Sequence, residues 1–171
     1  DESVVSPLTP GSADVAIVGD LSRQAAALRR SDGDFILQPL QPTWVDERPV
    51  TRPRLLRSGQ TIRLGPGVRV LFTQPNPLTG TARLDLVSHH RFQPRVDGVL
   101  LLADSWVLGP HPGSHVVCRD GASELVFFRG AEGWSCRASE EVEVDGRPRT
   151  GAIPVRAGMR MRGTSFSLGL E

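Results

Sequence analysis

One segment of this chain occurs twice, and the repeat constrains the fold more than any other feature of the sequence. Val45–Thr51 matches Val144–Thr150 at five of seven positions, at an offset of 99. The match continues in register from Leu56–Arg63 to Val155–Arg162, where Arg, Gly and Arg recur and apolar positions stay apolar. Upstream landmarks pair with slightly drifting offsets: Asp20 with Asp120, Ser22 with Ser123, and Gly33 with Gly133. A fixed period of this kind indicates two copies of one structural unit.

Short apolar runs, separated by turn-forming residues, fill the chain between these landmarks. With 18 glycines and 14 prolines in 171 residues, long helices are not expected. Several runs alternate with period two, which is typical of strands with one buried face. Their spacing, about 8–12 residues, favours an all-β sandwich or barrel. The predicted strands are 15–18, 35–37, 43–45, 60–64, 68–72, 82–86, 99–103, 106–108, 115–118, 124–128, 140–144 and 165–170.

The segment Leu21–Arg30 is the one place where local propensity favours a helix. It has a Ser suited to an N-cap, three consecutive alanines and a basic end. The corresponding stretch of the second copy, Ser123–Arg129, is rich in strand formers. Because two copies of one unit share a backbone, we predict a strand in both.

The repeat divides the chain into a first copy at residues 1–87, a polar linker at 88–95 and a second copy at 96–171. Nothing before Val15 corresponds to the apolar runs at 99–102 and 106–109 of the second copy. Either the opening strands of the first copy lie upstream of residue 1, or strands from elsewhere complete it. We favour the first explanation and expect the first copy to lack its N-terminal strands.

Charge and hydropathy narrow the function classes. The net charge is +1, and every basic residue is Arg, whereas nucleic-acid-binding domains normally carry a basic surplus. No apolar run reaches the length of about 18 residues that a membrane span requires, and the N-terminal residues lack the pattern of a signal peptide. We therefore expect neither nucleic acid nor membrane as a partner, and a cytoplasmic location.

The order of motifs in each copy resembles the forkhead-associated (FHA) domain, a β-sandwich of the SMAD/FHA type that binds phosphothreonine peptides. Asp20–Ala26 lies where that family has Ser-Arg-x-His-Ala, and Gln41–Glu47 lies where it has Asn-Gly-Thr-Phe-Val-Asn-Gly. The tail Leu56–Gly65 fits the family pattern Leu-x-x-Gly-Asp-x-Ile-x-Leu-Gly. The resemblance implies two FHA-like sandwiches in tandem.

By this resemblance the candidate phosphopeptide-binding residues of the first copy are Ser22, Arg23, Gln41 and Thr43. A hydroxyl and a guanidinium suit a phosphate, and Gln41 supplies the amide that the family's Asn provides. Ala25 occupies the position of the family's His. In the second copy Glu140 and Glu141 replace Asn-Gly, and two carboxylates repel a phosphate, so we expect no phosphate site there.

The sequence disfavours both a catalytic site and a metal site. Ser114 and His115 are adjacent, and neighbours on a strand point to opposite faces. His111, His115 and Cys118 lack an obvious fourth ligand for zinc. We expect no enzyme activity, metal or cofactor. Cys118 and Cys136 are placed on neighbouring strands by the resemblance, and a cytoplasmic location favours free thiols over a disulfide, although either remains open.

Two hypotheses follow. In the first, the chain is a non-catalytic interaction module of FHA type in signalling, whose first copy binds threonine-phosphorylated protein partners. In the second, it is a structural adaptor without phosphate recognition, and its sandwich surfaces bind partners or each other.

Overall fold

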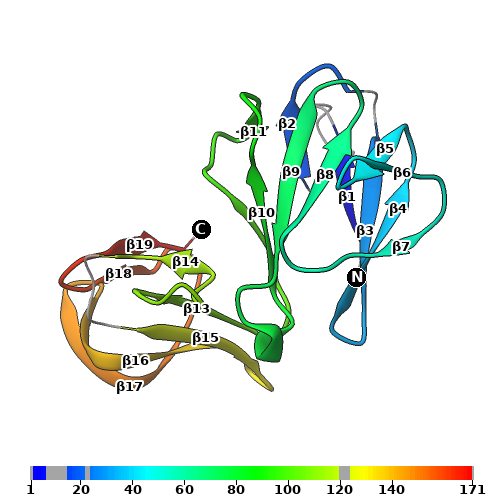
Figure 1. The fold of residues 1–171 in the computed structure, drawn as a ribbon. Coiled ribbons are helices and arrows are strands. Elements are labelled where there is room, and N and C mark those ends of the chain that lie inside the picture. The colour runs from blue at the N-terminus through cyan, green and yellow to red at the C-terminus, as the bar shows by residue number, and fades with distance from the viewer. Residues whose placement is uncertain (1, 7–14, 22–23, 120–123, 171) are drawn as a thin grey trace. The chain divides into compact units, whose positions relative to one another are not determined.

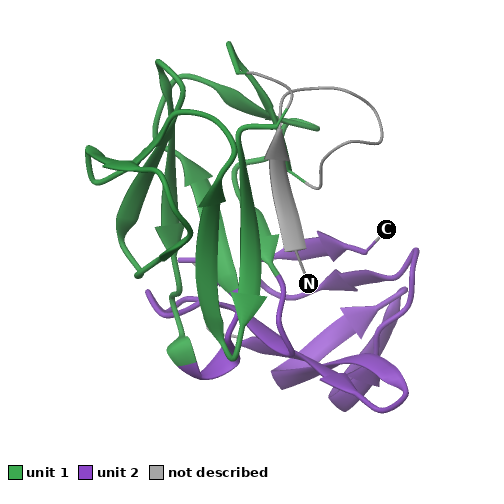
Figure 2. Ribbon diagram, turned by 90° about the vertical axis from the view of Figure 1, so that its right-hand side faces the viewer, with its two compact units in different colours: residues 1–77, 82–101 green, residues 78–81, 102–171 purple. Residues whose placement is uncertain are grey.

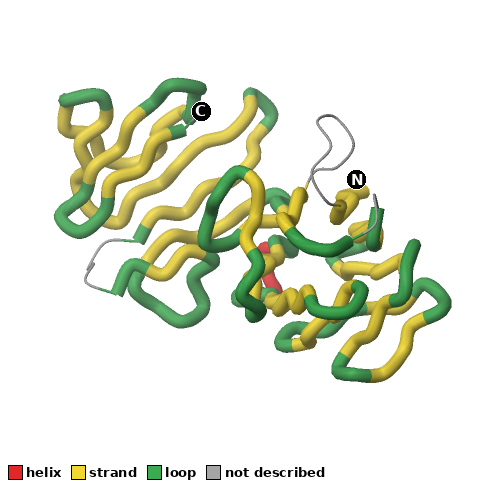
Figure 3. The backbone as a smooth tube through the Cα atoms, turned by 90° about the horizontal axis from the view of Figure 1, so that it is seen from above, coloured by secondary structure: helices red, strands yellow, loops and turns green. Residues whose placement is uncertain are grey.

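The computed structural model describes residues 2–6, 15–21, 24–119 and 124–170, with the backbone alone for 2–6. In these ranges the regular elements are strands, apart from the short 3-10 helix η1 (Pro77–Thr79) (Figures 1 and 3). The prediction of an all-β fold is thereby confirmed. Within the described ranges, no helix is both long and apolar enough to cross a membrane.

The chain divides into two compact units, coloured separately in Figure 2. Unit 1 contains residues 1–77 and 82–101, and unit 2 contains residues 78–81 and 102–171. This division differs from the linker predicted at 88–95. Within that stretch, Arg91–Gln93 forms a strand, and Phe92 is only 2% exposed. A buried aromatic side chain thus turns a polar-looking segment into part of the unit 1 core.

Unit 1 is a sandwich of two six-stranded sheets. Sheet A has the order β11–β2–β1–β3–β4–β7, and sheet B has the order β12–β10–β9–β8–β5–β6. The strands of sheet A are β1 (Glu2–Ser6), β2 (Val15–Val18), β3 (Ala26–Ser31), β4 (Asp34–Pro39), β7 (Arg54–Leu55) and β11 (Arg91–Gln93). Those of sheet B are β5 (Thr43–Val45), β6 (Arg48–Val50), β8 (Gln60–Leu64), β9 (Val68–Thr73), β10 (Ala82–Leu86) and β12 (Val99–Leu101).

The core of unit 1 lies between these sheets. In β2, β4, β8 and β9 the buried residues fall at alternate positions, as the period-two pattern predicts. Phe35 of sheet A and Phe72 of sheet B meet edge to face, with ring centroids 5.4 Å apart. The cluster also contains Val15, Ile17, Leu28, Leu37, Leu56, Ile62, Leu64, Val70, Ala82, Leu84 and Leu101.

The strand predicted within Leu21–Arg30 is confirmed for its second half. Ala26–Ser31 forms β3, which pairs antiparallel with both β1 and β4. Ala26, Ala27 and Leu28 are at most 2% exposed. The alanines fit because they are packed between neighbouring strands, where burial outweighs their preference for helix.

The expectation that the first copy lacks its opening strands is corrected by the structure. Strand β1 lies parallel to β2, with Val5 opposite Val15. Sheet B is extended by β10, which pairs antiparallel with β9, and by β12, which pairs with β10. β10 lies within the predicted first copy, whereas β12 comes from the predicted second copy, so one strand from elsewhere extends unit 1, as in the explanation that we did not favour.

Unit 2 is built from one strongly curved sheet. Its order is β14–β13–β15–β16–β18–β19, and β17 pairs with β16. The strands are β13 (Ser105–Gly109), β14 (Val116–Val117), β15 (Leu125–Gly130), β16 (Gly133–Val144), β17 (Arg147–Pro154), β18 (Arg160–Arg162) and β19 (Ser167–Gly169). The register of β16 with β17 shifts between Ala138 and Val142. Because a bulge bends a strand, both halves of β16 face one apolar core around Phe127, Cys136 and Met161.

The two units have the same pattern of strand pairing and the same backbone hydrogen bonds, at the offset seen in the sequence. Strand β13 pairs with β14 and β15 as β1 pairs with β2 and β3. Five N–H to carbonyl bonds recur: Leu40 to Ala25 and Ser139 to Glu124, Leu56 to Phe35 and Val155 to Trp134, Asp46 to Thr61 and Asp145 to Arg160, Gly59 to Phe72 and Gly158 to Leu170, and Gln60 to Arg57 and Met159 to Arg156.

Candidate functional site

Described residues of three loops of unit 1 come together at one end of the sandwich. They follow β2 (residues 19–21 and 24–25), β4 (40–42) and β8 (65–67). The N–H groups of Leu40 and Gln41 both donate to the carbonyl of Ala25, at 3.1 and 3.0 Å. The N–H of Gly65 donates to the carbonyl of Pro42 at 3.1 Å. Backbone hydrogen bonds thus join Ala25 to the 40–42 loop, and join that loop to Gly65.

The structure positions two of the four predicted site residues. Gln41 is exposed at the end of the sandwich. Thr43 is 2% exposed, and its hydroxyl donates to the carbonyl oxygen of Gln41 at 2.8 Å. Its side chain therefore orients the Gln41 loop and is turned away from solvent. Ser22 and Arg23 lie outside the described residues.

Ala25 links the two loops that carry the candidates. Its side chain is 1% exposed, so it packs in the core. Its carbonyl oxygen accepts both hydrogen bonds from the 40–42 loop. In the FHA family a His side chain at this position stabilises the loop. In this chain the described contacts between the loops after β2 and β4 are backbone hydrogen bonds.

His90 belongs to the same end of the sandwich, although it lies in the stretch that the sequence predicts to be a polar linker. Its Nδ1 lies 2.8 Å from the hydroxyl of Ser88. The ring lies so close to Gly19 that a Cβ on that glycine would be 2.8 Å from Cδ2 of His90. The residue is half-buried. No local signal predicts this position, since it follows from the path of the chain between β10 and β11.

In unit 2 the positions that correspond to the 40–42 loop lie within β16 and carry acidic residues. Ser139 donates its N–H to the carbonyl of Glu124 at 3.0 Å, which repeats the bond between Leu40 and Ala25. Glu140 and Glu141 follow directly, and both are exposed. Their carboxylates give this end of unit 2 the charge that disfavours a phosphate group.

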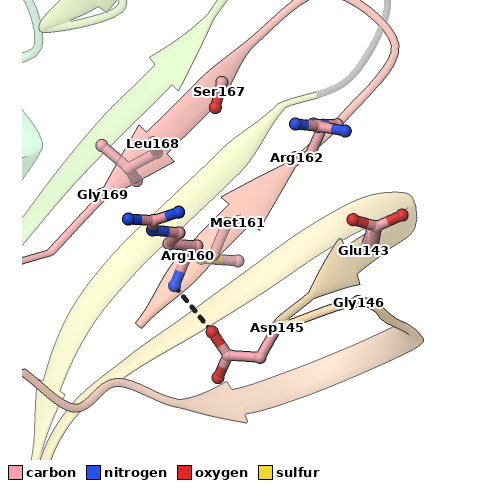
Figure 4. A pocket seen from close by; sticks show the side chains of 9 residues that line it. All are labelled: Glu143, Asp145, Gly146, Arg160, Met161, Arg162, Ser167, Leu168 and Gly169. Carbon is pink, nitrogen blue, oxygen red and sulfur yellow. Dashed lines mark hydrogen bonds between the residues drawn. The ribbon is translucent and has the colours of Figure 1, made fainter. Parts of the chain in front are cut away.

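A shallow pocket of about 380 Å³ lies on the outer face of unit 2, over β16, β18 and β19 (Figure 4). Arg160 and Arg162 line it together with Glu143 and Asp145. The backbone N–H of Arg160 and, next, the guanidinium of Arg156 lower the pKa of Asp145 from its ordinary value. Because cationic and anionic side chains alternate here, the pocket does not select a ligand of either charge.

His115 is a buried histidine within unit 2, with 1% of its surface exposed. Its Nδ1 accepts the N–H of Val107 at 3.1 Å, and its Nε2 lies 3.0 Å from the hydroxyl of Thr79. Burial lowers the pKa of the imidazole, while a backbone hydrogen bond with Thr81 acts in the opposite direction. These contacts give His115 a structural role.

The two cysteines are free, and they are not neighbours as the resemblance implied. Cys118 directly follows β14 and Cys136 lies on β16, and β13 and β15 lie between these strands. Cys136 is buried, and desolvation raises its pKa to about 12. Among the residues that the structure describes, no group of His, Cys, Asp and Glu could hold a metal ion.

Comparison with known families adds one finding. The sequence model of the FHA domain matches residues 11–65, which span β2 to β8 and include Ser22, Arg23, Gln41 and Thr43. Over these residues, all in unit 1, the chain is therefore similar to the FHA domain. The comparisons with curated proteins and with solved structures each found no match.

Proposed function

We propose that this chain is a non-catalytic interaction module, and that the FHA domain of unit 1 binds threonine-phosphorylated segments of protein partners at its loop end. Ser22 and Arg23 hold the phosphate, and Gln41 holds the backbone of the bound peptide. Thr43 positions Gln41. A cytoplasmic signalling role belongs to the same proposal.

The observation that carries the proposal is the coincidence of the FHA match with the loop arrangement. The matched residues contain all four candidates. Hydrogen bonds from Leu40, Gln41 and Gly65 join Ala25, the 40–42 loop and the start of the loop after β8. Binding sites favour loops that a rigid scaffold holds in place. An amide, a hydroxyl and a guanidinium are the groups suited to a peptide that carries a phosphate.

We further propose that unit 2 is a second, degenerate copy of the same module without a phosphate site. Its pairing pattern and its five recurring backbone hydrogen bonds support this assignment. The exposed carboxylates of Glu140 and Glu141, in place of an amide, support the loss of phosphate recognition.

The test is a titration of the full chain with one peptide in three forms: phosphothreonine, phosphoserine and unmodified threonine. We expect the phosphothreonine form to bind tightest. Arg23→Ala should weaken its binding by about tenfold or more, because a charge-assisted hydrogen bond contributes roughly 1.5–3 kcal/mol. Ser22→Ala and Gln41→Ala should each weaken it less.

Arg57→Ala and Ser58→Ala are matched controls, since the same residue types lie before the start of β8, away from the loop that follows its end. They should leave the affinity unchanged. Equal binding of all three peptide forms would reject phosphate recognition and favour the structural adaptor. Equal affinity for phosphothreonine and phosphoserine would reject the threonine preference alone.

A further inference from the structure

Strand β19 of unit 2 has an unpaired edge that its counterpart in unit 1 does not have. β19 pairs with β18 as β9 pairs with β8, and Gly169 and Leu170 occupy the places of Leu71 and Phe72. The other edge of β9 is paired with β10. Within the described ranges, no strand pairs with the other edge of β19. An unpaired edge is a template for a further strand.

An apolar groove of about 380 Å³ accompanies the unpaired edge of β19. Its apolar lining is contributed by Leu102, Trp106, Phe127, Trp134, Val155 and Leu170, all of unit 2. Trp106 stacks on Phe127 with ring centroids 4.0 Å apart, yet Trp106, Trp134 and Leu170 remain partly exposed.

Unit 1 shows what covers the corresponding surface. Phe35, Leu56 and Phe72 correspond to Trp134, Val155 and Leu170, and they are at most 3% exposed. Strand β10 lies directly beside them: Leu84 is opposite Phe72 and is itself 1% exposed. The difference in burial between the units therefore coincides with the presence of β10 in one of them.

Both ends of the segment that contains β10 and β12 are held in unit 2. Thr81, immediately before β10, donates its hydroxyl to the carbonyl of Ser105 at 2.7 Å and accepts the N–H of Ala103 at 2.8 Å. Leu102, immediately after β12, lines the apolar groove. Residues 82–101 thus leave unit 2 and return to it within the chain.

We propose that unit 2 is a second binding surface for this chain's own strand pair, β10 and β12, while β11 stays in sheet A. In this alternative arrangement β10 leaves β9 and pairs antiparallel with β19, so that Leu84 lies opposite Leu170 and enters the groove between Trp106 and Trp134. Asp85 then lies opposite Gly169, as it now lies opposite Leu71. The two units compete for the strand pair β10 and β12. The core of a unit is shielded from solvent when this pair is bound to it. This inference is independent of phosphate binding.

Disulfide trapping in the full chain tests the proposal. Asp85→Cys is combined with either Leu71→Cys or Gly169→Cys in a Cys118→Ser background, and Asp85, Leu71 and Gly169 are not in the fully buried core. Under mild oxidation both pairs should form an intrachain disulfide, the first from the arrangement described here and the second from the alternative. Asp85→Cys with Ser167→Cys is the register control and should not cross-link, because it is two residues out of register.

Tryptophan fluorescence in a Trp44→Phe background gives a second measurement. Locking Asp85→Cys to Gly169→Cys should protect Trp106 and Trp134 from acrylamide quenching at least twofold, whereas the Leu71→Cys lock should leave them accessible. A cross-link with Leu71→Cys but none with Gly169→Cys would overturn the proposal. Cross-linking of Gly169→Cys only between two molecules would also overturn it, since the strand pair would then come from a second copy.

Discussion

The hydroxyl of Thr43 donates a hydrogen bond of 2.8 Å to the carbonyl oxygen of Gln41, two residues earlier in the chain. The bond closes the turn that leads from β4 to β5 and fixes the direction in which Gln41 leaves the sandwich. The motif predicts that Thr43 contacts the ligand, but its hydroxyl instead positions Gln41.

Thr43→Val should destabilise the protein by about 1 kcal/mol, because the shape of the side chain is kept while one hydrogen bond is lost. It should also weaken phosphopeptide binding less than Gln41→Ala does. Urea denaturation and peptide titration measure the two effects. Thr43→Ser keeps the hydroxyl and should restore binding; a Thr43→Val variant that abolishes binding while Thr43→Ser does not restore it would contradict the positioning role.

Gly146→Ala should destabilise the protein by about 1 kcal/mol, since a side chain in the left-handed region costs roughly this amount. Gly146 has a φ of 80°, and a Cβ added there would meet no atom within 4 Å, so the cost comes from the backbone alone. Gly169→Ala is the control, because that position also has open space and lacks a positive φ. Thermal or urea denaturation should show a lower stability for Gly146→Ala than for Gly169→Ala.

The free energy of unfolding should fall as the pH drops below about 6.5, the ordinary pKa of histidine. Burial lowers the pKa of His115 in the folded protein, so the unfolded chain binds the proton first and acid favours unfolding. The contribution is fully present above the unfolded pKa. Asp145 does not interfere, because its lowered pKa places its effect below its ordinary value of 3.8.

Urea denaturation between pH 8 and pH 5 measures this dependence. His115→Gln should reduce the dependence of the free energy of unfolding on pH. His111→Gln, at an exposed position, should leave that dependence unchanged. If the free energy of unfolding of His115→Gln depends on pH as steeply as that of the native protein, another group is responsible.

Thiol reagents should modify one cysteine rapidly at pH 8. Desolvation raises the pKa of Cys136 to about 12, so almost no reactive thiolate is present there, whereas Cys118 is partly exposed. Cys118→Ser should abolish the rapid reaction of the native protein, and addition of denaturant should restore the reaction of Cys136. Rapid modification of Cys136 in the native Cys118→Ser variant would contradict its burial.

The sequence alone determined the repeat and many of the strands. Thr43–Val45, Gln60–Leu64 and Ala82–Leu86 occur as strands with the bounds that the apolar pattern predicts. The Asp46–Glu47 and Asp145–Gly146 turns have positive φ values at the equivalent positions. These features are local, because alternation of apolar residues and turn chemistry act over a few neighbouring residues.

Only the tertiary structure decided which strands pair. It brought β10 and β12 to sheet B of unit 1, buried Phe92 in a segment that looks like a linker, and separated Cys118 from Cys136 by two strands. A strand of alternating pattern fits any open sheet edge that buries its apolar face. Which sheet edge a strand pairs with depends on side chains that are distant in the sequence. The pattern of residues within the strand therefore does not predict it.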